Sequence, residues 1–279
     1  MIIFPSLKQI QEDYKRKNPP DFITHLNYVY CFNELSKNLK LDCRVDIKNK
    51  IKESKYLIKK IHLIELLRKN LQEEHKLILG TTSFAEICVP WITVKSYYLI
   101  FNLLLVLEYL ITSDEHSFSS SHEGILKKLK MRIKNTNLVF NKSELNKNYK
   151  GRSVLNWKAK PHANIKIINP NNRERFFQII KILMRYRAEE FKRKKDIKTL
   201  NCKEGKDFLD KSSINICEFF YWYRIKSNYR DLEFLDKKID DDQFLDFYQN
   251  YFNLTENFRK AYTILINDLS VKRLGKEIL

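Results

Sequence analysis

Residues that form tight turns are scarce in this chain, which contains only 5 glycines and 6 prolines among 279 residues. A sheet-rich protein of this length needs many turns, and Gly and Pro are among the residues that form them most readily. Hydrophobic residues make up 43% of the chain, enough to build a core despite the high charge. The sequence therefore predicts an all-α protein in which a few loops join long helices.

Apolar residues at helical spacing predict helices along most of the chain. Gly80 is expected to end one of them, and the acids Asp240, Asp241 and Asp242 suit the beginning of the last. A sequence resembling a capping box, at residues 82–86, precedes an apolar stretch. From residue 135 to 172 no helical period survives, and this segment is interpreted as a basic loop. The expected helices cover residues 6–17, 21–40, 45–79, 92–112, 122–134, 173–198, 212–237 and 241–273.

Several classes of protein are disfavoured by what the sequence lacks. The 5 cysteines are scattered without Cys-x-x-Cys spacing, so no zinc site or disulfide framework is expected. No P-loop, dinucleotide-binding or zinc-protease motif occurs. The N-terminal segment does not resemble a signal peptide, and the longest apolar run, 97–111, is too short to span a bilayer. We therefore expect a soluble, cytoplasmic protein without a metal or other cofactor.

The net charge of +18 is concentrated in one part of the chain. Residues 124–211 contain 25 Lys and Arg against 8 Asp and Glu, which is nearly the whole surplus. Segregated positive charge is typical of proteins that bind polyanions such as RNA. An acidic protein partner and an ordinary solvated surface are the alternatives. The candidate nucleic-acid-binding residues are Lys127, Lys128, Lys130, Arg132, Lys150, Arg152, Trp157, Lys158, Arg173, Arg175, Arg185 and Arg187.

Three separate segments of the chain carry short motifs in a fixed order. Tyr97, Tyr98 and Phe101 form a Tyr-Tyr-x-x-Phe pattern on one expected helix. After a polar turn, Ser121-His122-Glu123-Gly124 begins the next helix, and residues 224–231 contain an arginine-bearing helical run. In this order the three segments resemble the HEPN superfamily, and the resemblance spans about residues 86–269. It divides the chain into an N-terminal helical extension, 1–85, and an HEPN-like bundle, 86–279, with a basic insertion at about 127–172.

The resemblance implies a four- or five-helix bundle that is often a homodimer. Many HEPN proteins are metal-independent ribonucleases of toxin–antitoxin or antiviral systems, whereas others are non-catalytic RNA-binding or adaptor modules. The resemblance therefore implies RNA, either tRNA or mRNA, as the target, and an antitoxin or defence-system protein as a partner. Catalytic members carry Arg, four to six residues and then His on one helix. The histidine moves the proton of a ribose 2′-hydroxyl, and the arginine binds the phosphate.

This chain departs from that pattern because no histidine follows Arg224 at the required spacing. Tyr229 stands there instead, and a tyrosine with its ordinary pKa of about 10 is a poor base at neutral pH. Arg224, Asn228, Tyr229 and His122 are the candidate catalytic residues, although His122 suits a helix start as well. Two hypotheses stay open: a metal-independent endoribonuclease, and a non-catalytic module that binds nucleic acid or a protein partner.

Overall fold

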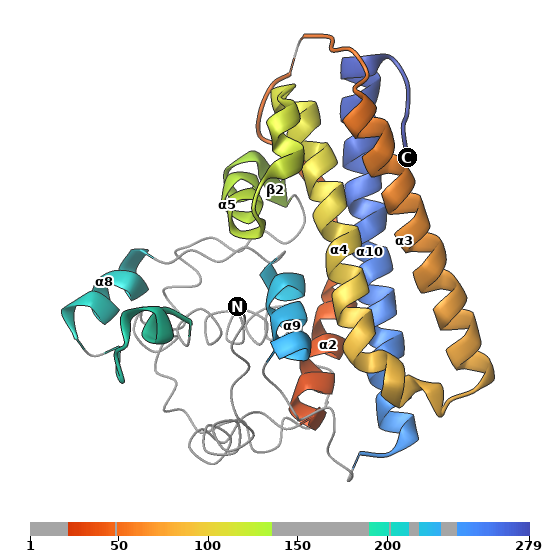
Figure 1. Ribbon diagram of the computed structural model, residues 1–279, viewed down its shortest axis with the longest axis vertical. Helices are drawn as coiled ribbons and strands as arrows, with labels where there is room; N and C mark the ends of the chain where they lie inside the picture. The colour runs from red at the N-terminus through yellow and green to blue at the C-terminus, as the bar shows by residue number, and fades with distance from the viewer. Residues whose placement is uncertain (1–21, 48, 136–189, 201, 212–217, 230–238) are drawn as a thin grey trace, which may run out of the picture.

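The structure is a computed structural model that describes residues 22–47, 49–135, 190–200, 202–211, 218–229 and 239–279. Helices dominate these residues, which confirms the all-α prediction; the HEPN-like architecture as such stays a prediction (Figure 1). The predicted helix 6–17, the predicted loop 135–172 apart from Asn135, and most of the predicted helix 173–198 lie outside the described residues. The elements are α2 (Phe22–Ser36), β1 (Leu41–Cys43), α3 (Lys55–Gly80), α4 (Phe84–Thr112), η1 (Glu115–Ser119), α5 (His122–Arg132), β2 (Ile133–Asn135), α8 (Lys203–Lys211), α9 (Glu218–Tyr229) and α10 (Asp241–Leu274).

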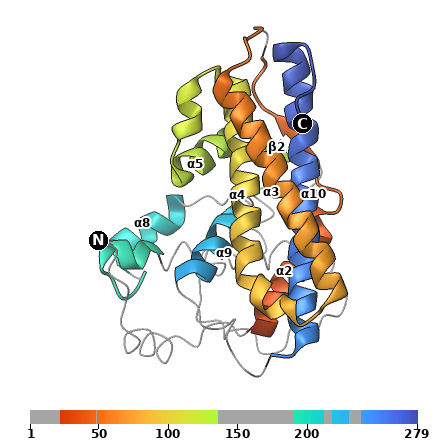
Figure 2. The ribbon, with the colours of Figure 1, turned by 45° about the vertical axis from the view of Figure 1, so that its right-hand side comes forward.

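Helix α4 forms the centre of the protein, with α10 and α3 packed along it and α9 and α5 on its other side (Figures 1 and 2). Every residue from Leu99 to Leu110 is buried. The helix is long and apolar enough to cross a membrane, but 78% of its most apolar window is buried inside the protein. The core therefore accounts for its apolar character, which is consistent with a soluble protein.

The helices that precede residue 85 share this core. Phe32 of α2 is buried, and its ring centre lies 5.2 Å from that of Phe258 in α10. Leu57 and Ile64 of α3 are also buried in the same hydrophobic cluster. The predicted division at residue 85 lies at the junction of α3 and α4, and the core is continuous across it.

The helix predicted over residues 45–79 was placed too early, since α3 begins only at Lys55. Ser54 caps it, because the Ser54 Oγ accepts a hydrogen bond of 3.1 Å from the amide of Tyr56. The preceding residues include β1, which pairs antiparallel with β2. A local cap and a distant strand partner therefore override an apolar pattern that extends further towards the N-terminus.

Two further differences from the sequence prediction concern α4 and α8. Helix α4 begins at Phe84 rather than at residue 92 and continues through Pro90. Ser83, its N-cap residue, makes no side-chain capping bond, so the predicted capping box is absent. The hydroxyl of Thr93 donates a hydrogen bond of 2.7 Å to the Pro90 carbonyl within this first part of the helix. Helix α8 was not predicted.

The last helix agrees closely with the prediction. Asp240 accepts a hydrogen bond from the amide of Gln243, and the Gln243 side chain accepts one from the Asp240 amide, so the two residues form a capping box. The helix ends at Leu274 and is capped by Gly275, whose φ of 78° favours glycine. Tyr251 and Phe258 of this helix are fully buried and anchor it in the core.

Candidate functional site

The three segments that resemble HEPN proteins meet in space. The Tyr97 hydroxyl, from the middle of α4, is hydrogen-bonded to Nδ1 of His122, the first residue of α5. The guanidinium carbon of Arg224, from α9, lies 5.2 Å from the Tyr97 ring centre and 5.5 Å from the Tyr98 ring centre. Tyr221 of α9 lies beside them, with its ring centre 5.9 Å from that of Tyr97. We refer to these five residues as the Arg224 cluster.

Packing of α9 on two sides brings Arg224 to this position. Phe219, Phe220 and Tyr223 are fully buried among the aromatic residues of α2 and α10. On the side facing α4, the hydroxyl oxygens of Ser227 and Thr93 are hydrogen-bonded at 2.8 Å. Thr93 lies about one helical turn from Tyr97 on α4, and Ser227 lies about one turn from Arg224 on α9. The hydrogen bond therefore fixes the register that places Arg224 over the tyrosine rings.

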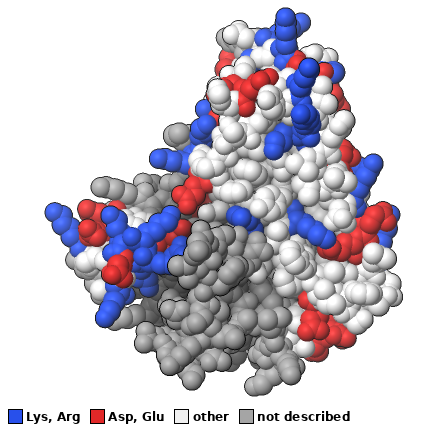
Figure 3. Space-filling view, viewed as in Figure 1, with Lys and Arg blue, Asp and Glu red and all other residues white. Residues whose placement is uncertain are grey.

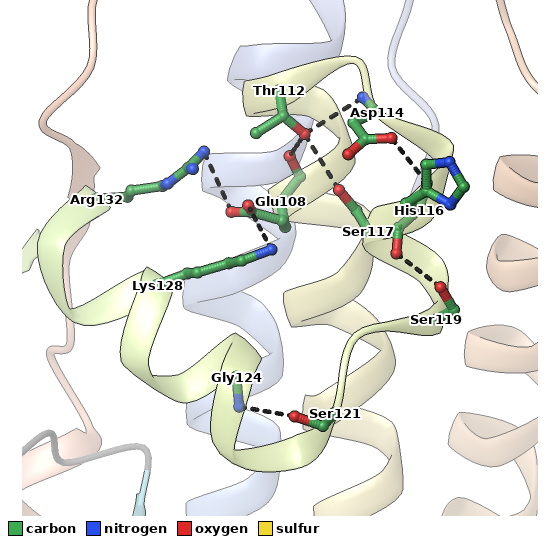
Figure 4. Close-up of polar contacts among 10 residues, drawn as sticks. All are labelled: Glu108, Thr112, Asp114, His116, Ser117, Ser119, Ser121, Gly124, Lys128 and Arg132. Atoms are coloured by element: carbon green, nitrogen blue, oxygen red, sulfur yellow. Dashed lines mark hydrogen bonds and ion pairs between the residues drawn. The ribbon is translucent and has the colours of Figure 1, made fainter.

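His122 is held by the way α5 begins. The Ser121 Oγ accepts a hydrogen bond of 3.1 Å from the amide of Gly124 and so caps the helix (Figure 4). A Cβ atom at Gly124 would lie only 2.9 Å from that oxygen, so a larger residue would require the Ser121 side chain to shift. The His122 ring lies against Phe101, with their centres 4.4 Å apart. Ser121 therefore caps the helix, and the side chain of His122 faces Tyr97 and Tyr98.

The charge of Arg224 is not neutralised by any described residue. No described carboxylate pairs with its guanidinium, and its Nε is buried without a hydrogen-bond partner. A ring face attracts a cation without cancelling its charge. Burial lowers the pKa of His122, and the charge of Arg224 lowers that pKa further. Burial raises the pKa of Tyr97 well above its ordinary value. The cluster therefore presents a guanidinium beside a neutral imidazole and a neutral phenol.

The other two candidate catalytic residues lie in the last turn of α9. Asn228 is one helical turn from Arg224, and Tyr229 is the final residue of the helix. Their side chains lie outside what the structure describes. Tyr97, which the sequence identified only as part of a pattern, is in contact with both His122 and Arg224. Tyr97 is therefore a residue of the site that the sequence did not identify as a catalytic candidate.

Two of the predicted nucleic-acid-binding residues pair with a carboxylate inside the protein. Glu108 of α4 is 1% exposed; Lys128 Nζ lies 3.7 Å from its Oε1, and the guanidinium Nη1 of Arg132 lies 3.3 Å from its Oε2 (Figure 4). Lys128 and Arg132 lie on α5, one helical turn apart. We call these three residues the Glu108 cluster. Its cations stabilise a buried charge, which is a structural role.

Other predicted basic residues are only partly covered by the structure. Lys127 is exposed on α5, and the side chain of Lys130 is not among those that the structure describes. Figure 3 shows further Lys and Arg gathered around α8 and the neighbouring segment 190–198. Lys194 of that segment binds Glu123 at 3.3 Å, so part of the basic segment adjoins the start of α5. Lys150, Arg152, Trp157, Lys158, Arg173, Arg175, Arg185 and Arg187 lie outside the described residues.

Arg68 and His75 on α3 also match the Arg-to-His spacing, although they precede the helix with the tyrosine pair, whereas the family motif follows it. Arg68 pairs with Glu65 of its own helix at 2.8 Å, and the His75 ring stacks on Phe252 of α10 with centres 3.9 Å apart. Arg68 therefore takes part in an ion pair within α3, and His75 packs α3 against α10. Within the described ranges, no group of His, Cys, Asp and Glu is arranged to hold a metal ion.

Comparison of this chain with models of protein families, with curated proteins and with solved structures found no match. The functional argument therefore depends on the chemistry of the Arg224 cluster. A guanidinium with unused donors suits a phosphate, and an adjacent neutral imidazole suits proton transfer.

Proposed function

We propose that this protein targets RNA as an HEPN-like, metal-independent endoribonuclease of the cytoplasm. The single observation that carries the proposal is the Arg224 cluster: an arginine without a described carboxylate partner lies beside a histidine whose pKa is lowered. The setting in a toxin–antitoxin or antiviral system is what the family resemblance implies. The protein surface at the start of α5, next to the basic segment at Lys194, would receive the RNA backbone.

In the proposed reaction, a ribose 2′-oxygen attacks the adjacent phosphorus and the bond to the 5′-oxygen breaks. The products are a 2′,3′-cyclic phosphate and a 5′-hydroxyl. His122 takes the 2′-hydroxyl proton at Nε2, and water gives a proton to the departing 5′-oxygen. This requires the tautomer in which Nδ1 carries the proton and donates it to the Tyr97 oxygen. Arg224 binds the phosphate oxygens, where negative charge grows in the transition state.

The proposal changes the family pattern in one respect. Catalytic HEPN proteins carry the histidine on the same helix as the arginine, whereas here His122 comes from α5 and Arg224 from α9. The neutral form of His122 is favoured by burial and by the nearby guanidinium. A neutral imidazole at pH 7 is the form that can act as a base.

A direct test is incubation of total tRNA and an mRNA with the purified protein in the presence of EDTA. We expect cleavage by the wild type and a fall of roughly 10²-fold or more for Arg224→Ala and for His122→Asn. Arg259→Ala is the matched control, because Arg259 pairs with Glu256 on its own helix, α10. It should cleave like the wild type. Cleavage by Arg224→Ala at the wild-type rate would remove the cluster from the mechanism.

A second candidate function is binding of RNA without cleavage. The absence of a histidine after Arg224 on α9 favours it. It predicts RNA binding that weakens steeply with salt, with no cyclic phosphate formed, and a smaller salt slope for Arg224→Ala. Product analysis across a salt series separates the two functions, because only the enzyme yields new RNA ends.

A further inference from the structure

Helix α3 carries two apolar series, each with a spacing of seven residues. The buried series faces the core: Leu57, Ile64, Leu71 and Ile78 are each at most 2% exposed. The second series stands one position earlier, and its apolar members are exposed: Tyr56 by 55%, Leu63 by 37% and Leu77 by 68%. Asn70 occupies the remaining position of that series and is also exposed. An amphipathic helix needs only one such series to pack on its own core. Within the second series, the Tyr56 ring stacks on Phe118 of η1 with centres 6.4 Å apart, and Leu63 and Leu77 are the apolar members left for another contact.

Helix α4 continues the exposed apolar surface. Its first half presents Phe84, Ile87, Trp91 and Tyr98, whose exposed fractions are 51%, 62%, 56% and 36%. Their steps of three, four and seven residues place them on one face of the helix.

The two exposed series border the same seam between α3 and α4. Lys95 pairs with Glu74 across this seam, and Lys60 donates a hydrogen bond of 3.0 Å to Asn102. On α4, the exposed Trp91 lies one turn from Lys95, and the exposed Tyr98 lies one turn from Asn102. On α3, Leu63 and Leu77 likewise follow Lys60 and Glu74 by three residues. The two helices therefore form one two-helix apolar surface, which we call the α3–α4 face, and Figure 3 shows a broad uncharged area on this side of the protein.

The charges around the α3–α4 face select the kind of partner. Each acid of α3 already has a cation: Glu65 binds Arg68, Glu73 binds Lys76 and Glu74 binds Lys95. The exposed lysines Lys55, Lys59 and Lys69 form no ion pair with a described residue. The unpaired charge of α3 is thus positive, which favours an acidic partner and disfavours a second copy of the same face.

We propose that the α3–α4 face binds an amphipathic helix of a partner protein, with an apolar heptad series flanked by acidic residues. A third helix lying along a two-helix seam inserts its side chains between theirs, and a heptad spacing keeps that contact continuous. Asn70, as a polar residue within an apolar heptad series, fixes the register of the incoming helix. The face meets the Arg224 cluster only at Tyr98, so this inference stands apart from the proposed function.

The test uses a synthetic helix of four heptads with Leu at both core positions and Glu at both flanking positions. A second peptide carries Lys in place of each Glu. Binding is followed by the fluorescence of Trp91, which is 56% exposed and would be covered. We expect the Glu peptide to bind and to change the Trp91 emission, and the Lys peptide not to bind. Trp91→Phe should remove the response.

The decisive variant combines Leu63→Ser with Leu77→Ser. It should weaken binding of the Glu peptide by about tenfold or more, because apolar anchors carry most of the binding energy of an interface. The matched control combines Ile264→Ser with Val271→Ser, which removes exposed apolar residues of α10 outside this face and should leave binding unchanged. An unfolding transition like that of the wild type verifies that each variant folds.

Three results would overturn the inference. The first is no binding of the Glu peptide to the wild type, or equal binding of the Lys peptide. The second is a dimer of the protein in sedimentation that dissociates in the double Leu→Ser variant, which would make a second copy the occupant. The third is binding to phosphatidylserine vesicles through this face, with no binding of the peptide.

Discussion

The two ends of helix α5 hold cations in contrasting surroundings. At its C-terminal end, Lys128 and Arg132 pair with a carboxylate that is almost fully buried in α4. At its N-terminal end, His122 lies beside Arg224, whose guanidinium lies over two tyrosine rings and pairs with no described carboxylate. Basic side chains thus stabilise the fold in the Glu108 cluster, whereas in the Arg224 cluster the charge of the arginine stays available to a ligand. Positive charge in a sequence does not by itself identify a ligand site; the presence or absence of a carboxylate partner does.

The largest expected effect tests the structural half of this comparison. The double substitution Lys128→Ala and Arg132→Ala leaves Glu108 buried without a counter-charge and should lower the free energy of unfolding by about 3–5 kcal/mol. Denaturant titration measures this. Adding Glu108→Leu should restore most of the loss, because the buried charge is then gone. A loss below about 1 kcal/mol in the double variant would show that the Glu108 cluster is not structural.

A smaller effect is expected where the two clusters are linked, at the start of α5. Ser121→Ala removes the helix cap and should cost about 1 kcal/mol, measured by the same titration. Because the cap also positions His122, RNA cleavage should fall in this variant. Ser119→Ala is the control: Ser119 is exposed and caps no helix, so the change should be within about 0.5 kcal/mol. Equal losses in both variants would contradict the role of the cap.

Arg224→Ala tests the other half of the comparison and should hardly change stability. The side chain contributes cation–π contacts worth about 0.5–1 kcal/mol, and its removal leaves no carboxylate of the described residues unpaired. A loss of several kcal/mol would show that Arg224 is a structural residue like Arg132. The unfolding curve and the RNA cleavage rate of the same preparation should therefore diverge for this variant.

The smallest effect concerns the protonation of His122. Its pKa in the folded protein lies below the ordinary 6.5, so the neutral form contributes stability above about pH 6.5 that is lost as the pH falls through the folded pKa. Arg224→Ala removes one cause of the lowered pKa and should move it up towards 6.5, as followed by NMR of the ring protons. His75 is the internal control, because burial rather than Arg224 lowers its pKa. A downward shift of the His122 pKa would contradict the contact.

Much of the helical architecture could be predicted because its causes are local. The last helix was predicted within a residue of each end, since Asp240 and Gly275 mark its termini through their own hydrogen bonds and φ. The beginning of α3 could not be predicted, because residues 41–43 pair with a strand some ninety residues away. The apolar pattern continued beyond the helix without any sign of that pairing.

The candidate site was predictable in its parts but not in its assembly. Arg224, His122 and the tyrosine pair were each selected from the sequence. Their contact depends on α9 packing against α4 in the register fixed by Thr93 and Ser227. The polar residues Asn102 and Glu108, which interrupt an apolar run, were a usable signal that buried polar contacts exist. Their partners, Lys60 for one and Lys128 with Arg132 for the other, could not be read from the pattern.

By itself, the sequence determined the helical class, the apolar central helix and the uneven distribution of charge, because backbone hydrogen bonding, capping and side-chain spacing act over a few residues. Only the tertiary structure decided which cations are neutralised, that Arg224 and His122 share Tyr97, and that α3 keeps a second apolar face exposed. These outcomes depend on which helix faces meet, and the free energy of that choice is distributed over the whole core.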